Sequence, residues 1–236
     1  MMKKILAAAI VFLTLAANAQ NKSFNLSVNG GVAIPTGNFS KADYSDESSG
    51  FAKTGFHLNL SGVYQFNKNW GAGILIGYSQ FGFKNPLSLA EGYKEDSGTD
   101  STTLYQLGHN SNFSVLVGPY YFIPAGKNVL IDIRALGGYV NTHLAGFRIF
   151  YEDYTDNVMT QEKTSGGTFG FQLGAGVKYS VAKKVSLHFN IDYFSSHPKL
   201  PITYDDFVVN SGRRLTSYDK AISGVNASVG VGINLF

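Results

Sequence analysis

Hydrophobic and polar residues alternate with a period of two through most of the chain from Phe24 to Leu235. Successive side chains of a β-strand point to opposite faces, so this period predicts strands that each have one apolar face. Counting the alternation gives eight strands and therefore an all-β fold. The eight segments are 24–34, 56–66, 70–79, 113–121, 129–139, 168–179, 185–193 and 225–235.

The connections between these segments alternate in length. Three are tight turns, near 67–69, 124–128 and 182–184, and four are long polar segments, near 36–53, 84–106, 143–166 and 196–221. This layout is typical of an up-and-down transmembrane β-barrel with short periplasmic turns and long extracellular loops. We therefore predict an eight-stranded antiparallel barrel of this type. A hairpin hidden in one of the long loops would raise the number of strands. Because Pro lacks a ladder donor, we also expect a bulge or a strand end near Pro119.

The phase of the alternation separates a membrane barrel from a soluble barrel with the same number of strands. In a soluble barrel the polar phase faces water and is rich in Lys and Glu. Here the polar phase consists mostly of Gly, Ser, Asn, Thr and Gln, which the narrow interior of an eight-stranded barrel accommodates. We therefore expect the apolar phase to face lipid and the polar phase to face the lumen.

Four charged residues lie near the middle of predicted strands, all of them in the lumen phase: Asp132, Arg134, Lys178 and Asp192. On the lipid side, an Arg or Lys would cost about 2–4 kcal/mol at the bilayer midplane. Inside the lumen these charges must pair with one another or be hydrated. We predict a lumen charge network that plugs the barrel, in preference to a path for protons or ions.

Aromatic residues mark both ends of the predicted strands. Membrane barrels place Trp and Tyr at the two lipid–water interfaces, so we predict an aromatic girdle at each end. The girdle residues are Tyr64, Trp70, Tyr121 and Tyr179 at the short-turn end and Tyr78, Tyr139 and Tyr193 at the loop end, with Phe24, Phe56 and Phe113 in the same two belts.

The N-terminus has the pattern of a secretory signal peptide. Lys3 and Lys4 precede an apolar run, and Ala17-Asn18-Ala19 fits the small-x-small cleavage pattern. We predict a signal peptide over residues 1–19 and one outer-membrane barrel domain over residues 20–236. Without the two lysines the formal net charge falls from +3 to +1, so no nucleic-acid partner is indicated. The chain has no Cys, which excludes a disulfide framework.

With this signal pattern, the eight alternating segments and a final strand SVGVGINLF, the chain resembles the small outer-membrane β-barrel families, including the PorT-like and the OmpX- and OmpW-like proteins. The resemblance implies contact with outer-membrane lipid and lipopolysaccharide. It also implies insertion by the barrel-assembly machinery, for which a terminal aromatic residue is the recognition feature, and Phe236 matches it. Val231, Ile233 and Leu235 hold the apolar phase here, so we interpret Phe236 as an end marker.

Two functional classes fit this architecture without any catalytic chemistry. The first is a structural or interaction role in which the loops contact surface ligands or envelope proteins. Stretches 146–154 and 202–209 interleave aromatics and carboxylates, and we expect them to extend the barrel as hairpins that offer an edge to a partner. The second is OmpW-like passage of small hydrophobic solutes. Its candidates are apolar residues of the lumen phase, which would equally form a gasket: Leu75, Leu116, Leu136, Val140 and Phe194.

A third class is an acyl-hydrolase or acyltransferase at the rim, which needs Ser and His within hydrogen-bond reach. Candidate residues near the loop bases are His109, His143, His197, Ser111, Ser165 and Ser195. Loops rich in Ser and Asp produce such a match by chance, so we predict no enzyme and no catalytic residue. No HxxxH pattern occurs and the acidic residues lack a calcium-loop spacing, so we predict neither a metal nor a cofactor. We favour the structural or interaction role.

Overall fold

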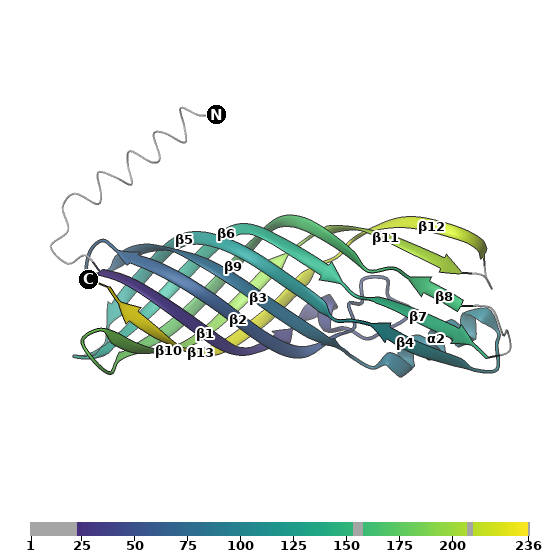
Figure 1. Cartoon of the computed structure of the whole chain (residues 1–236), viewed down its shortest axis with the longest axis horizontal. Helices are drawn as coiled ribbons and strands as arrows, with labels where there is room; N and C mark the ends of the chain where they lie inside the picture. The colour runs from purple at the N-terminus through teal and green to yellow at the C-terminus, as the bar shows by residue number, and fades with distance from the viewer. Residues whose placement is uncertain (1–22, 153–157, 207–209, 236) are drawn as a thin grey trace, which may run out of the picture.

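The computed structural model describes residues 23–152, 158–206 and 210–235. Eight antiparallel strands close into a barrel in the order β1-β13-β10-β9-β6-β5-β3-β2, which confirms the predicted fold (Figure 1). Closure is made by the first and last strands, which pair Val28 with Val231. The barrel strands are β1 (Ser23–Pro35), β2 (Ala52–Gln65), β3 (Trp70–Phe83), β5 (Asn110–Pro124), β6 (Val129–Leu144), β9 (Thr164–Ser180), β10 (Val185–Ser196) and β13 (Ile222–Asn234).

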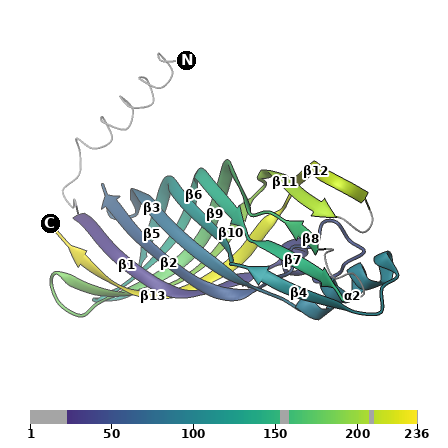
Figure 2. The same ribbon diagram turned by 45° about the vertical axis from the view of Figure 1, so that its right-hand side comes forward.

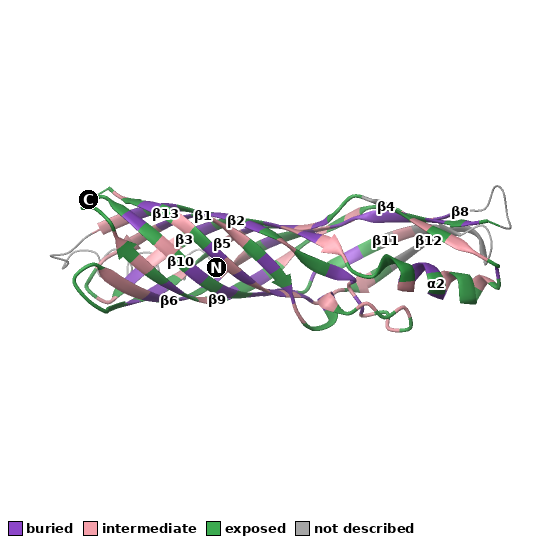
Figure 3. Ribbon diagram, turned by 90° about the horizontal axis from the view of Figure 1, so that it is seen from below, coloured by how far each residue is buried: buried purple, intermediate pink, exposed green. Residues whose placement is uncertain are grey.

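The two phases of each barrel strand point as the composition predicts. Val28 and Ile191 are 62% and 63% exposed on the outer wall, whereas Asp192, the next residue, is 1% exposed inside. Buried and exposed residues accordingly alternate along the barrel strands (Figure 3). The outer wall is therefore apolar, and small and polar residues line part of the lumen.

The expectation of a bulge or strand end near Pro119 is wrong. β5 runs through Pro119, which pairs with Ala72 of β3. On the other side, Val117 pairs with Gly137 and Tyr120 with Arg134, so the register with β6 is the same before and after the Pro. Only the pairing of Gly118 and Pro119 with β6 is missing. The lost donor is thus tolerated locally, without an inserted residue.

A second sheet stands at the loop end of the barrel, away from the C-terminus (Figure 1). Its strand order is β12-β11-β8-β7-β4. The hairpins β7–β8 and β11–β12 confirm the predicted extension of both loop stretches, although residues 153–157 and 207–209 lie outside the described residues. The strands are β4 (Thr102–Leu107), β7 (Gly146–Tyr151), β8 (Val158–Gln161), β11 (Lys199–Asp206) and β12 (Asn210–Asp219). Because this sheet is separate, the barrel itself keeps eight strands.

One helix accompanies the second sheet, and sequence analysis assigned its residues to a loop. Helix α2 (Pro86–Ser97) begins with Pro at its first position and is followed by Gly98, which has a left-handed φ of 66°. Both are ordinary start and stop signals, because Pro needs no donor there and Gly adopts positive φ without strain. Within the described residues, no helix is long and apolar enough to span a membrane.

The second sheet has its own hydrophobic core. Phe147, Ile149 and Tyr151 of β7 and Met159 of β8 are buried against α2 and the first loop, residues 36–51, which includes the short helix η2 (Gly37–Ser40). Burying such side chains contributes about 1.5–3 kcal/mol each, so the long loops form a packed body. We call the second sheet, α2 and the first loop together the loop-end layer (Figure 2).

Candidate functional site

Arg134 lies at the centre of a buried polar cluster in the barrel lumen. Its Nε and Nη2 donate to the two carboxylate oxygens of Asp192 at 2.7 and 2.8 Å, and its Nη1 donates to Asp132 Oδ1 at 2.7 Å. Nη1 also donates to Asn190 Oδ1 at 3.1 Å. A guanidinium that holds one carboxylate in a bidentate pair and a second carboxylate beside it is fixed in position.

Small residues on β9 create the space for this cluster. Arg134 and Asp192 belong to β6 and β10, which are separated in the barrel by β9. A side chain at Gly174 would collide with the Asp192 carboxylate, and one at Gly176 would lie 2.6 Å from Asp132 Oδ2. The two glycines are therefore required for close approach of the charged groups across the intervening strand.

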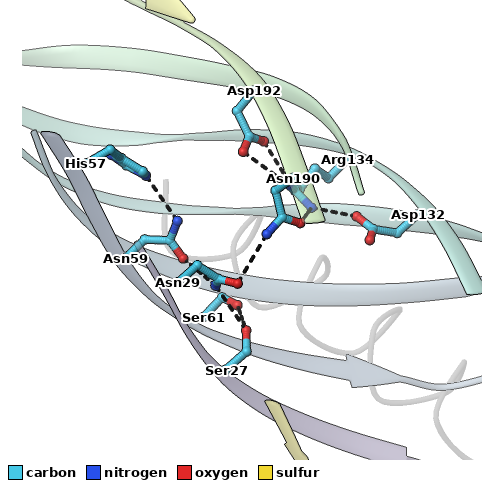
Figure 4. Close-up of polar contacts among 9 residues, drawn as sticks. All are labelled: Ser27, Asn29, His57, Asn59, Ser61, Asp132, Arg134, Asn190 and Asp192. Carbon is cyan, nitrogen blue, oxygen red and sulfur yellow. Dashed lines mark hydrogen bonds and ion pairs between the residues drawn. The ribbon is translucent and has the colours of Figure 1, made fainter. Parts of the chain in front are cut away.

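The cluster continues as a chain of hydrogen bonds across the lumen (Figure 4). Asn190 Nδ2 donates to Asn29 Oδ1 at 3.1 Å, and Asn29 Nδ2 donates to Asn59 Oδ1 at 2.8 Å. Asn59 in turn lies 3.0 Å from His57 Nε2. The alternation places these Asn and His residues in the lumen phase of three separate strands, but it does not predict that they contact one another. The polar chain connects opposite walls of the barrel.

Lys178 is the one predicted member of the charge network that lies apart from it. Its Nζ donates to Asn234 Oδ1 at 2.7 Å, near the short-turn end. Among the described ion pairs, Arg134 pairs with Asp132 and Asp192, and Lys178 has none. The predicted network thus consists of three residues plus neighbouring amides.

A small cavity separates Arg134 from the short-turn end of the barrel. It has a volume of about 40 Å³ and is lined by Arg134, Asp132, Lys178 and His188 together with Tyr120. A buried water needs at least about 10–15 Å³ and two to four polar partners, so this cavity has room for a few waters. Ser23, Gln65, Leu130 and Lys178 line both this cavity and a larger space of about 590 Å³ at the short-turn end.

Apolar side chains fill the lumen beside the polar cluster. The five apolar residues that sequence analysis placed in the lumen phase are all buried and belong to one cluster: Leu75, Leu116, Leu136, Val140 and Phe194. From the first loop, Phe39 joins the same cluster and packs edge-on against Phe81, with ring centroids 5.0 Å apart. Within the described residues, the buried apolar cluster of the lumen thus combines side chains from the strands with one ring from the first loop.

The predicted girdle residues lie on the outer wall. Tyr64 is half-buried, and the other six are exposed: Trp70, Tyr78, Tyr121, Tyr139, Tyr179 and Tyr193. Trp70 and Tyr121 are paired on adjacent strands with ring centroids 5.0 Å apart, and Phe56 and Tyr78 at the other end are 5.9 Å apart. Aromatic rings therefore lie on the outer wall near the short-turn end and near the loop end of the barrel.

Two charged residues hold the first loop in the loop-end layer. Lys220 Nζ donates to the backbone oxygens of Glu47 and Ser49 at 3.0 and 2.6 Å, and burial lowers the pKa of this lysine. The pKa of Asp46 lies below its ordinary value, because its carboxylate accepts hydrogen bonds from Lys41 and then from Ser48. Lys220, which follows β12, therefore ties the first loop to the second sheet, and the contacts of Asp46 lie within the first loop itself.

Among the described residues, the candidate catalytic His and Ser side chains share no hydrogen bond with one another. The strand register places His143 opposite Ser111 of β5 and opposite Ser165 of β9, but no hydrogen bond joins these side chains. Among the described residues, no three His, Cys, Asp or Glu side chains are grouped so that they could hold a metal ion. Phe236 and the predicted signal peptide, residues 1–19, lie outside the described residues.

Comparison with known proteins gives a family match and structural neighbours. The family "Outer membrane protein beta-barrel domain" matches residues 5–234. A major outer membrane protein from Thermus thermophilus has a similar structure, with a TM-score of 0.52, 12% identity and coverage of 92% of this chain and 100% of that chain. This likeness supports the barrel fold.

Two further structures are more distant. Neisserial surface protein A (NspA) has a TM-score of 0.46, 14% identity and coverage of 91% of this chain and 99% of that chain. OprG from Pseudomonas aeruginosa has a TM-score of 0.47, 13% identity and coverage of 91% and 97%. A search of curated proteins gave no match. Because the family match extends over nearly the whole chain, this protein belongs to the outer membrane protein β-barrel domain family.

Proposed function

We propose that this protein is a structural or interaction component of the outer membrane, with a lumen closed to solutes and a loop-end layer that contacts partners. The observation that carries the proposal is the filled lumen. Arg134 and its carboxylates occupy one part, and a buried apolar cluster that includes Leu116 and Val140 occupies another. Closed eight-stranded barrels are filled by their side chains, so activity is expected outside the lumen.

The outer face of the second sheet supports an interaction role. On the side away from the buried core, Tyr105 is 62% exposed, Phe150 is 40% exposed and Arg148 is exposed. The register places Tyr105 of β4 directly opposite Arg148 of β7. Tyr, Phe and Arg are enriched at protein interfaces, which makes this face the best candidate for contact with an envelope protein or surface ligand.

OmpW-like passage of hydrophobic solutes is the weaker alternative. Its candidate residues Leu116, Leu136 and Val140 are buried against one another, so they would have to separate before a solute could enter. This packing favours the gasket interpretation. An enzymatic role at the rim has still less support, because His143 has no hydrogen bond to a neighbouring Ser.

The proposal also covers the export of the chain and its placement in the outer membrane. Residues 1–19 direct export and are removed, and Phe236 marks the end of the barrel for the assembly machinery. Trp70, Tyr121 and the other girdle residues lie at the lipid–water interfaces, where their amphipathic rings are favourable. Outer-membrane lipid and lipopolysaccharide surround the apolar wall.

Complementation of a deletion strain tests this assignment. The full chain is compared with a barrel-only variant, in which residues 86–107, 147–160 and 200–218 are replaced by short Gly-Ser turns. Heat-dependent gel mobility verifies that both barrels have closed. The proposal predicts that the full chain restores the envelope phenotype and the barrel-only variant does not. Equal rescue by a closed barrel-only variant would overturn it.

A further inference from the structure

A cavity lies between the loop end of the barrel and the loop-end layer. It has a volume of about 590 Å³ and is lined by the first loop, α2, β7 and the ends of several barrel strands. We call it the mouth cavity. Sites for small organic molecules usually measure about 300–1,000 Å³, so its size suits a ligand of drug-like dimensions.

Aromatic side chains form much of the wall of the mouth cavity, and they support one another. Tyr44 packs edge-on against Tyr93 with ring centroids 5.1 Å apart, and Tyr93 is 6.2 Å from Phe147. Phe51 and Phe83 are stacked at 5.6 Å. Because these rings come from the first loop, α2, β3 and β7 and contact one another, the wall is already formed without a ligand.

The charged side chains around the mouth cavity are mostly acidic. Asp46, Glu47, Glu95 and Asp96 line it together with a single cation, Lys220. The ammonium of Lys220 is already bound to two backbone oxygens, Asp46 is paired with Lys41, and Asp96 accepts a hydrogen bond from Tyr44. Glu47 and Glu95 are exposed and have no hydrogen bond or ion pair through their side chains to another described residue.

We propose that the mouth cavity binds an organic cation with an apolar body, such as an aryl or alkyl ammonium. Aromatic faces attract cations. With Asp46 paired to Lys41, the carboxylates of Glu47, Glu95 and Asp96 still outnumber the single lining ammonium of Lys220, which favours positive charge over negative charge. In this arrangement the apolar body lies against Tyr93 and Phe147, and the cationic head faces Glu47 and Glu95. The inference rests on the proposed function, since it assigns a ligand class to the loop-end layer.

Calorimetry tests this inference with the full chain in nanodiscs of zwitterionic lipid. The probe is benzyltrimethylammonium, which is soluble and does not form micelles, and benzenesulfonate is the anionic comparison. We expect saturable binding of the cation and none of the anion. Glu95→Gln and Glu47→Gln are each expected to weaken binding about five- to tenfold, because each removes one attractive charge near the head group.

Glu91→Gln is the matched control, because Glu91 is exposed on the same helix but does not line the mouth cavity. It is expected to leave the affinity unchanged. Tyr93→Leu should weaken binding while keeping the charge, which tests the aromatic wall separately. The inference is overturned if the cation does not bind saturably, if benzenesulfonate binds equally well, or if Glu91→Gln weakens binding as much as Glu95→Gln. Such a failure would leave the closed-barrel proposal intact, since complementation tests that proposal independently.

Discussion

Arg134 is the residue that balances the buried negative charge of the lumen. Its guanidinium satisfies two carboxylates that would otherwise be buried and unpaired. Asp132 and Arg134 are two positions apart on one strand, so their proximity was predictable from the sequence. The participation of Asn29, Asn59 and Asn190 was not, because it depends on barrel closure and on the register of strands that are distant in the chain.

Arg134→Met is expected to destabilise the barrel by about 3–5 kcal/mol, the usual cost of leaving buried carboxylates without their partner. The free energy of unfolding is measured by urea titration in lipid, with the fluorescence of Trp70 as the reporter. Lys184→Met, on an exposed turn, is the control. A loss no greater than that of the control would contradict the role assigned to Arg134. Adding Asp132→Asn and Asp192→Asn to the Arg134 variant should recover much of the loss.

Gly174→Ala tests the close approach of the cluster to β9. The added methyl group would collide with the Asp192 carboxylate, so we expect a loss of about 1–3 kcal/mol in the same unfolding assay. Gly82→Ala is the matched control, since its nearest neighbour would be 3.5 Å away and its φ is not in the left-handed region. Equal stability of the two variants would show that the glycine is dispensable.

At the scale of elements, the barrel strands and the loop-end layer differ in how strongly the sequence specifies them. Each barrel strand extends over 12 to 17 residues, so its alternation of apolar and polar residues is long enough to be recognised in the sequence. β4, β7 and β8 have only six, six and four residues, and their pattern is hidden among polar loop residues. Helix α2 was missed although Pro86 and Gly98 bound it, because its apolar stripe is weak.

Gly92 couples α2 to the first loop. A methyl group at this position would overlap the ring of Tyr44, so the glycine allows the ring to lie on the helix. Gly92→Ala favours an isolated helix by about 1 kcal/mol, yet we expect it to release the first loop. Hydrogen exchange of residues 41–51 in nanodiscs should become faster, whereas Lys94→Ala, exposed on the same helix, should leave it unchanged. Unchanged or slower exchange in Gly92→Ala would contradict the packing described above.

At the scale of the whole molecule, the structure combines a closed eight-stranded barrel with a packed layer at its loop end. The order of the strands and the apolar outer wall follow from the alternation and from the lengths of the connections. The mouth cavity was not predictable, because it lies between segments of the first, second, third and fourth loops that meet only after the barrel has closed. The family match fixes the class of protein and is consistent with many activities.

The central claim is that the lumen is closed, and single-channel conductance in a planar bilayer tests it most directly. The refolded protein is first checked by heat-dependent gel mobility, so that only closed barrels are measured. We predict no discrete channels, because the buried apolar cluster and the Arg134 network occupy the lumen between the short-turn end and the loop end. Discrete channels that change with Asp132→Ala or Arg134→Ala would contradict the claim and establish a conducting lumen.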